Sequence, residues 1–184
     1  MSILSNFEEK TYKTETIYKG KIVQLDIDSV TLPDGKTSKR ELIKHPGAVA
    51  VIALTDEGKL ICVEQYRKPL EKNLVEIPAG KLEPGEDPKA CALRELEEET
   101  GYTSDDLNLI TSFYTSPGFA DEIVHVYFTD RVEKLNEKPA GDVDEFVELM
   151  EITVEEAEQL EKEQKIHDAK TAYAILYLKL RRNG

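Results

Sequence analysis

The sequence lacks the features of secreted and membrane proteins. It contains two cysteines, Cys62 and Cys91, which do not have the spacing of a metal-ligand motif. No apolar run approaches the roughly 20 residues that span a bilayer. The first ten residues, MSILSNFEEK, show no positive segment followed by an apolar one, so we expect no secretory signal. We therefore expect a cytoplasmic protein with no membrane partner and two buried, reduced thiols.

Basic residues are in short supply, and this excludes one common class of partner. The chain has 24 Lys and Arg against 37 Asp and Glu, which gives a formal net charge of −13. Binding to a nucleic-acid backbone usually shows a basic patch, so we expect no nucleic-acid partner. If the acidic residues converge, they need a cation, and a cation would let an acidic protein hold an anionic substrate.

The pattern of apolar residues predicts a chain made mostly of strands before its final third. Residues 11–29 and 39–44 are predicted as N-terminal strands with a turn at 32–35 between them. Residues 48–54 (AVAVIAL) form a continuous apolar run, and with residues 60–65 they predict a central hairpin buried on both faces. Further strands are predicted over residues 74–77, 107–114, 122–128 and 146–150.

Three helices are predicted from capping residues and amphipathic spacing. Asp87 and Pro88 are a favoured N-cap and first residue, and Gly101 can end the same helix in the left-handed conformation. Residues 153–163 and 168–180 are amphipathic, the second with Ala172, Ile175, Leu176 and Leu180 along one face. The order of elements predicts an α+β fold in which helices sandwich a mixed sheet.

The helix between Asp87 and Gly101 carries an unusual cluster of acids. Glu95, Glu98 and Glu99 stand at i, i+3 and i+4, so they share one helix face. Like charges at this spacing repel one another, and the helix dipole disfavours negative charge near a helix C-terminus. A hard cation with oxygen ligands would offset both penalties.

The residues around this cluster complete a longer motif over the 23 residues from Gly80 to Tyr102. Gly80 is followed after five residues by Glu86, and after seven more by Arg-Glu-Leu-x-Glu-Glu-x-Gly-Tyr. This order resembles the signature of the Nudix hydrolase family at every specified position. The resemblance implies an α/β/α sandwich and hydrolysis of a nucleoside diphosphate linked to another moiety.

The resemblance also implies metal-site roles by position. Glu95 and Glu99 are the principal ligands of Mg²⁺, for which Mn²⁺ is a possible substitute. Glu98 and the Ala79 carbonyl are additional ligands. Glu86 either ligates directly or pairs with Arg94, which would then orient the carboxylates.

Other segments are similar to the ADP-ribose pyrophosphatase branch of that family. Pro117 follows Gly101 by 16 residues and, with Gly118, belongs to a Ser-Pro-Gly loop. Residues 63–69 resemble the segment whose arginine, here Arg67, contacts the diphosphate. The branch implies hydrolysis of ADP-ribose to AMP and ribose 5-phosphate.

The branch implies a general base in an acidic loop and an adenine pocket. Glu145 aligns with the catalytic loop and is the expected base, with Asp142 and Asp144 as alternatives. Some relatives clamp the base between tryptophans, but this chain has none. By position, Ile22 and Arg40 stand there, and an arginine can stack on adenine.

Apolar residues of the N-terminal strands need cover, because isolated two-stranded hairpins are marginal in water. We expect residues 1–44 to form a dimerisation region, which the branch exchanges between subunits, and residues 45–184 to form the hydrolase domain. The expected assembly is a homodimer with exchanged N-terminal strands.

Two alternatives remain open at this stage. The first keeps the fold and changes the substrate to another nucleotide sugar, a dinucleoside polyphosphate or an oxidised nucleoside triphosphate. The second is a non-enzymatic nucleotide sensor. A sensor would be expected to lose carboxylates of the motif, and none is missing here.

Overall fold

A computed structural model describes residues 7–141 and 146–182 of the chain. The chain divides into two compact units, of which the first comprises the described part of Met1–Gly47 together with Tyr114–Ile123. The second comprises Ala48–Phe113 and the described part of Val124–Gly184. Each unit is described by itself.

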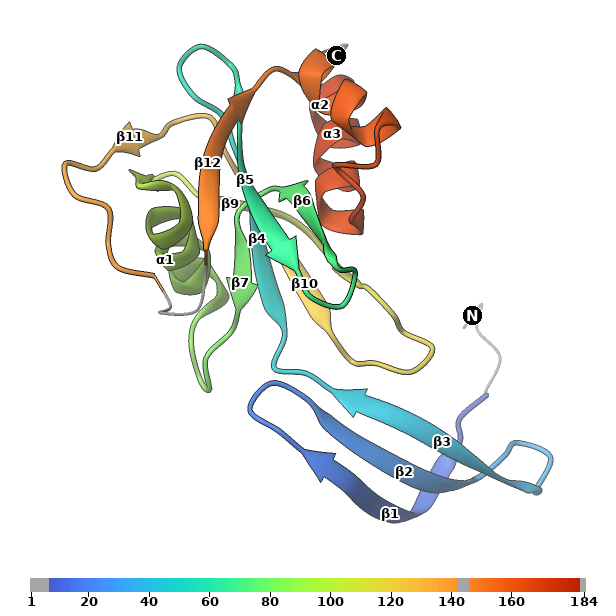
Figure 1. Ribbon diagram of the computed structural model, residues 1–184. Helices are drawn as coiled ribbons and strands as arrows, with labels where there is room; N and C mark the ends of the chain where they lie inside the picture. Colours follow the sequence, from blue (N-terminus) through green and yellow to red (C-terminus); the bar gives the residue numbers. More distant parts are fainter. Residues whose placement is uncertain (1–6, 142–145, 183–184) are drawn as a thin grey trace, which may run out of the picture. The chain divides into compact units, whose positions relative to one another are not determined.

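The first unit is built on an antiparallel sheet of β1 (Lys10–Lys19), β2 (Gln24–Thr31) and β3 (Thr37–Lys44), in that order (Figure 1). The prediction of one strand over residues 11–29 is therefore wrong. The chain reverses between β1 and β2, where the Gly20 amide donates to the Val23 carbonyl at 2.9 Å. The predicted turn before β3 is present, and its Gly35 has a φ of +83° that favours glycine.

Strand β1 is exposed along its whole length, whereas β2 has a partly buried face. Asp26 of β2 is buried and accepts hydrogen bonds from the Thr16 hydroxyl at 2.7 Å and from the Gln24 side-chain amide. Two apolar side chains of β1, Ile17 and Tyr18, are at least half exposed. The outer strand thus presents apolar surface that the first unit does not cover.

The second unit contains the remaining strands and all three helices. The strands are β4 (Ala48–Ala53), β5 (Leu60–Arg67), β6 (Lys72–Glu76), β7 (Ala79–Lys81), β8 (Tyr102–Thr103), β9 (Asn108–Tyr114), β10 (Ile123–Thr129), β11 (Glu133–Lys134) and β12 (Val147–Ile152). The helices are α1 (Pro88–Thr100), α2 (Val154–Lys162) and α3 (Ala169–Arg182).

The strands pair in the orders β7-β4-β10-β9, β12-β5-β6 and β11-β8. Because β4 and β10 are parallel while β4 and β7 are antiparallel, the first of these sheets is mixed, as the sequence predicts. The predicted pairing of residues 48–54 with 60–65 as a hairpin is wrong. Strands β4 and β5 lie in different sheets, and the isolated bridge of Leu54 with Leu60 begins one residue after β4 ends.

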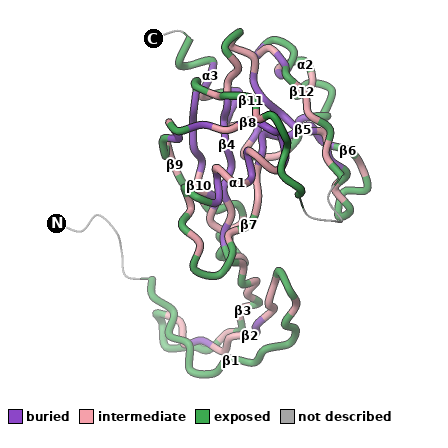
Figure 2. The backbone as a smooth tube through the Cα atoms, turned by 90° about the vertical axis from the view of Figure 1, so that its left-hand side faces the viewer, coloured by how far each residue is buried: buried purple, intermediate pink, exposed green. Residues whose placement is uncertain are grey.

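Strand β4 separates two apolar cores. Ala50 and Ile52 belong to the core that α2 and α3 cover, whereas Val49 and Val51 belong to the core that α1 covers. This division follows from the alternation of side chains along a strand. Figure 1 shows α1 on one side of these strands and α2 with α3 on the other, and Figure 2 shows burial concentrated in the strands between them. The predicted α/β/α sandwich is confirmed.

Helix α3 buries only part of the predicted apolar face. Its buried residues are Thr171, Ala174, Ile175 and Leu178. Of the predicted face, Ile175 is buried, whereas Leu176 and Leu180 are 59% and 75% exposed. Of the helices in the described residues, none is both long and apolar enough to cross a membrane.

Candidate active site

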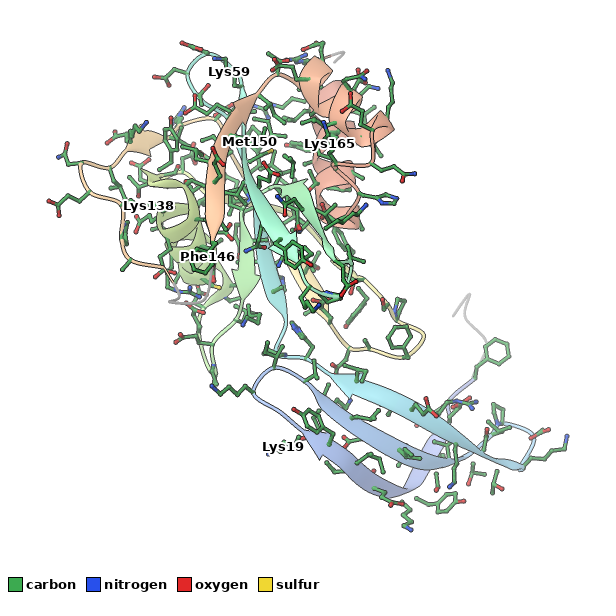
Figure 3. All side chains as sticks on the ribbon, in the orientation of Figure 1. Lys19, Lys59, Lys138, Phe146, Met150 and Lys165 are labelled. Atoms are coloured by element: carbon green, nitrogen blue, oxygen red, sulfur yellow. The ribbon has the colours of Figure 1, made fainter. Side chains whose placement is uncertain are left out.

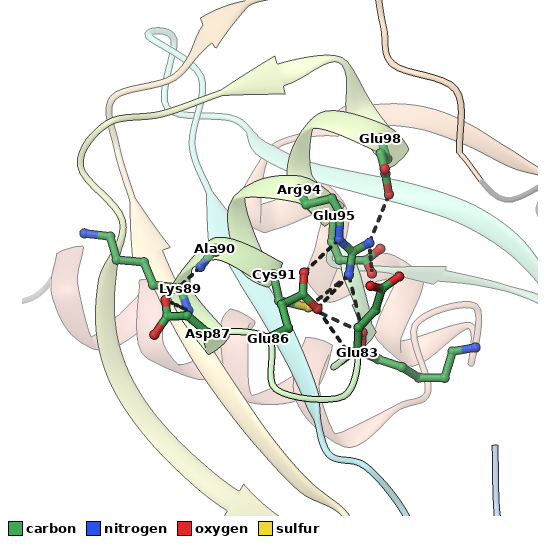
Figure 4. Close-up of polar contacts among 10 residues, drawn as sticks. Glu83, Glu86, Asp87, Lys89, Ala90, Cys91, Arg94, Glu95 and Glu98 are labelled. Atoms are coloured by element: carbon green, nitrogen blue, oxygen red, sulfur yellow. Dashed lines mark hydrogen bonds and ion pairs between the residues drawn. The ribbon is translucent and has the colours of Figure 1, made fainter. Parts of the chain in front are cut away.

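Helix α1 begins and ends where the capping residues predict. The Asp87 carboxylate accepts from the backbone amides of Lys89 and Ala90, both at 3.1 Å (Figure 4). Gly101 ends the helix with a φ of +72°, and its amide donates to the Glu97 carbonyl at 2.9 Å. Because both ends are fixed by local residues, the sequence sets the extent of the helix, and the helical period then places Glu95, Glu98 and Glu99 on one face.

Arg94 is the centre of the ionic contacts on this face. Its Nε and Nη2 donate to the two oxygens of Glu86 at 3.0 and 3.1 Å, and its Nη1 donates to Glu95 at 2.8 Å and Glu98 at 3.0 Å (Figure 4). The hydrogen bond from Arg94 lowers the pKa of Glu86 to about 2. One guanidinium thus orients three carboxylates, and of the two predicted roles for Glu86 the structure shows the pairing with Arg94.

Two glutamates of the helix are buried against strand β7. Glu95 is 7% exposed and Glu99 is 3% exposed. The Glu99 carboxylate accepts from the Ala79 amide at 3.0 Å. A Cβ atom at Gly80 would overlap the Glu95 carboxyl group, so glycine leaves the space that this carboxyl group occupies against the strand. Gly80 and the motif residues Glu95 and Glu99 therefore lie next to one another in the structure.

The donor chemistry of this face suits a hard divalent cation. Glu86, Glu95, Glu98 and Glu99 supply only oxygen atoms, the ligands that Mg²⁺ prefers. Within residues 7–141 and 146–182, no three acidic, histidine or cysteine side chains are already grouped closely enough to hold a metal ion. Glu95 and Glu99 are buried, and buried carboxylates need compensating positive charge. A divalent cation can supply that charge.

We expect Gly80→Ala to lower kcat by about 10²-fold, the effect that a displacement of roughly 1 Å can have at a reacting centre. The added methyl group collides with the Glu95 carboxyl group and must push the strand or the glutamate aside. Steady-state kinetics at saturating cation, with circular dichroism to check the fold, measures this. Activity above about half of wild type would show that the close approach is not needed.

A cavity of about 520 Å³ opens beside two glutamates at the end of α1. Glu98 and Glu99 line it together with Tyr66, Lys138 and Phe146. Lys138 donates from Nζ to the Glu99 carbonyl at 2.7 Å, which satisfies a backbone acceptor at the end of α1. Figure 3 places Lys138 and Phe146 beside this helix. The cavity gives a ligand access to the acidic face.

The sequence alone does not predict the role of Lys138. The residue lies far along the chain from α1, and strand pairing brings its segment back to the helix. Glu133 pairs with Thr103 and Lys134 pairs with Tyr102 in the short β8–β11 ladder. No sequence pattern marks such a two-residue ladder.

Arg67, the expected diphosphate contact, is held by a buried acid. Its Nε and Nη2 donate to the two oxygens of Glu76 at 2.6 and 2.8 Å. Burial of Glu76 tends to raise the pKa of that carboxyl, but hydrogen bonds and charge from Arg67 and Lys170 outweigh it and lower the pKa to about 2. Glu76 therefore stays ionised and fixes the plane of the guanidinium.

The remaining predicted contacts lie in the first unit or outside the described residues. Ile22 is 49% exposed, and Arg40 pairs with Glu9 at 2.6 Å. Pro117 and Gly118 lie in a loop in which the Phe119 and Ala120 amides donate to the Ser116 carbonyl at 3.1 and 2.9 Å. Glu145, Asp142 and Asp144 lie outside the described residues.

The two cysteines are buried and form no disulfide. Burial raises the pKa of Cys91 to about 12 and that of Cys62 further still. Both are therefore protonated thiols at neutral pH and poor nucleophiles.

A family model described as the NUDIX domain matches residues 44–174. The chain belongs to the Nudix family. The matched span of this Nudix chain includes Gly80, the whole of α1 and Lys138, so the residues that meet at the acidic face all lie within it.

Relatives and a solved structure extend the comparison beyond the Nudix domain. An ADP-ribose pyrophosphatase of Bacillus subtilis (strain 168) is 60% identical over 178 residues, which cover 97% of this chain and 96% of that protein. A methanol dehydrogenase activator of Bacillus methanolicus is 59% identical over 174 residues, 95% of this chain and 94% of that protein. A crystal structure of an ADP compounds hydrolase covers 98% of both chains with a TM-score of 0.84 and 19% identity, which supports the fold.

Proposed function

We propose that this Nudix chain hydrolyses the diphosphate of ADP-ribose to AMP and ribose 5-phosphate with Mg²⁺, and that Mn²⁺ can substitute. The observation that carries the proposal is the meeting of buried Glu95 and Glu99 with the Ala79–Gly80 backbone beside a cavity. Similarity over 97% of the chain to a protein named ADP-ribose pyrophosphatase supports the choice of substrate.

The proposed ligands of Mg²⁺ are the carboxylates of Glu95, Glu99, Glu98 and Glu86 and the carbonyl of Ala79. When bound, the cation neutralises the diphosphate and lowers the pKa of the attacking water. Arg94 keeps the carboxylates apart and oriented through the hydrogen bonds described above. The proposed role of these residues is thus to hold the carboxylate ligands in position for the cation.

Other residues act on the substrate in this proposal. Arg67 donates hydrogen bonds to the diphosphate, for which a fixed guanidinium is well suited. Arg40 and Ile22 of the exchanged N-terminal region contact the adenine at the other subunit's site, and Pro117 with Gly118 are proposed substrate contacts. A water oxygen bonds to phosphorus, the anhydride P–O bond breaks, and the proton of the water passes to Glu145.

A panel of substrates tests the proposed function. ADP-ribose, GDP-mannose, NADH and a nucleoside triphosphate are incubated with Mg²⁺, and the products are separated and identified. We expect fastest turnover of ADP-ribose, with AMP and ribose 5-phosphate formed in equal amounts. Faster turnover of another member would replace the substrate and keep the family chemistry. Lack of turnover of every member would favour a nucleotide sensor.

A second candidate function is stimulation of a methanol dehydrogenase, which the 59% identical relative of that name favours. Addition of the chain to such a dehydrogenase, with the rate measured with and without Mg²⁺, tests it. Equal stimulation by wild type and Glu99→Gln would separate this function from hydrolysis.

We expect the chain to form a homodimer in which the N-terminal strands pack across the partner. Support comes from β1, which is exposed over all ten residues and carries Ile17 at 50% and Tyr18 at 59% exposure. A sheet of three strands needs a covered hydrophobic face to be stable by itself, and a partner would cover the apolar side chains of β1. Light scattering at micromolar concentration should give twice the mass of one chain. A mass of one chain would refute the dimer.

A further inference from the structure

Four charged residues of the second unit form an alternating set. Arg67 at the end of β5 binds Glu76 at the end of β6, and the Glu76 carboxylate also accepts from Lys170 near the start of α3. Lys170 donates in turn to Asp168 at 2.9 Å. Glu76 and Lys170 have side chains only 3% and 15% exposed. The set holds two positive and two negative charges.

The two oxygens of the Asp168 carboxylate have different surroundings. Its Oδ1 accepts from Lys170 and from the Thr171 amide at 3.1 Å, so it caps the first turn of α3. Its Oδ2 is buried with no hydrogen-bond partner among the described residues. A buried carboxylate oxygen with no partner is costly, even though the Asp168 side chain as a whole is 19% exposed, so this residue is a poor choice for stability alone.

The set also adjoins the segment that leads to the acidic helix. The Ile77 amide, next to Glu76, donates to the buried Thr171 hydroxyl at 3.0 Å. Two residues further on, the Ala79 amide donates to the Glu99 carboxylate at 3.0 Å. The start of α3 and the acidic face of α1 are therefore joined through four consecutive residues, 76–79.

Arg67 is the member of the set that reaches solvent, with a side chain 37% exposed. Its Nε and Nη2 are taken by Glu76, and its Nη1 has no hydrogen-bond partner among the described residues. One edge of the planar guanidinium is thus fixed and the other is available to a ligand. A fork of this geometry matches the oxygens of a phosphate group.

Charge balance shows what Lys170 contributes to the set. With Lys170 present, the charges of Arg67, Glu76, Lys170 and Asp168 sum to zero. Lys170 shares the neutralisation of Glu76, and Asp168 holds Lys170 in place. Without Lys170, the three remaining groups carry an excess negative charge next to an anionic substrate.

We propose that Lys170 and Asp168 are positioning residues for diphosphate binding, which hold Glu76 and, through it, the Arg67 guanidinium in the orientation that meets a phosphate. This inference rests on the proposed function, in which Arg67 contacts the diphosphate. Neither residue touches the substrate in this arrangement. Their effect is expected on substrate binding more than on the chemical step.

A double-mutant cycle between Lys170→Met and Arg67→Ala tests the proposal. In the wild-type background, Lys170→Met should raise the KM for the diphosphate substrate about tenfold, the value of one charge-assisted hydrogen bond, with kcat changed much less. In the Arg67→Ala background, adding Lys170→Met should cause little further loss of kcat/KM, because the group that it positions is already gone. Lys179→Met is the matched control and should leave both constants unchanged, because Lys179 lies on the surface of α3 and pairs with Glu158 of α2.

Two results would overturn the proposal. One is an equal loss of kcat/KM in both backgrounds, which is what a purely structural role of Lys170 predicts. The other is an unchanged KM for Lys170→Met. If Lys170→Met does not fold, as judged by circular dichroism, Asp168→Asn replaces it in the same cycle, since asparagine keeps an oxygen for Lys170 and the Thr171 amide.

The cycle is measured with the panel member that wild type hydrolyses fastest. Failure to hydrolyse ADP-ribose would therefore refute the proposed substrate without deciding the role of Lys170. A wild-type KM for Arg67→Ala would refute the diphosphate contact and, with it, this inference.

Discussion

Glu99→Gln and Glu95→Gln are each expected to lower kcat by about 10³-fold or more at saturating Mg²⁺, because a metal ligand contributes several kcal/mol of transition-state stabilisation. Both side chains are buried at the point where α1 meets Ala79 and Gly80. The amide keeps the shape of the side chain and removes its charge. Steady-state kinetics over a range of Mg²⁺ concentrations measures the loss.

The fold should survive these substitutions. Each removes one negative charge from a crowded helix face, where like charges at this spacing cost a few tenths of a kcal/mol, so metal-free stability should hold or rise slightly. Glu97→Gln is the matched control, because Glu97 lies in the same acidic run but accepts from the Thr103 hydroxyl at 2.6 Å, away from the ligand positions. Retention of more than about a tenth of the activity by either test variant would refute the ligand assignment.

The second large effect is expected at Glu145, where Glu145→Gln should lower kcat by roughly 10² to 10⁴, the usual contribution of a general base. Substrate and Mg²⁺ binding should change little. Glu145 itself lies outside the described residues, but Gly141 and Phe146, on either side of it in the chain, line the cavity beside Glu98 and Glu99. This supports a search for the base in residues 142–145.

Asp142→Asn and Asp144→Asn are the matched controls for Glu145→Gln. They remove the same charge from the same loop, so a general electrostatic effect would appear in all three variants. Collapse of kcat in an aspartate variant, with Glu145→Gln near wild type, would assign the base to that aspartate. The pH dependence of kcat should lose its acidic limb only in the variant that lacks the base.

The acidic helix could be predicted from the sequence because its determinants are local. Asp87, Pro88 and Gly101 fix its ends, and a period of 3.6 residues then fixes which glutamates share a face. The structure adds the contact that local rules cannot give, namely the fit of the Glu95 carboxyl group over Gly80. That contact depends on where β7 lies, which tertiary pairing decides.

Strand pairing and the orientation of α3 were predicted less well for the same reason. Strands β4 and β5 follow one another closely, as in a hairpin, yet each pairs with strands far away in the chain. In α3, both Leu176 and Ala174 fit an apolar stripe, and packing against the sheet buries only the second. The roles of Lys138 and Lys170 also depend on long-range contacts, which local sequence patterns do not predict.

The parallel pairing of β4 with β10 bears on how fast the chain folds. Ala48 lies opposite Val124, 76 positions further along the chain, and no short turn can join parallel neighbours. Forming this pair closes a long loop, which is slow because the entropy of closure is lost before the contacts form. The acidic helix lies inside that loop and is stabilised by nearby residues. We therefore expect substitutions in β4 and β10 to change the refolding rate, and substitutions of the glutamates of α1 to leave it almost unchanged.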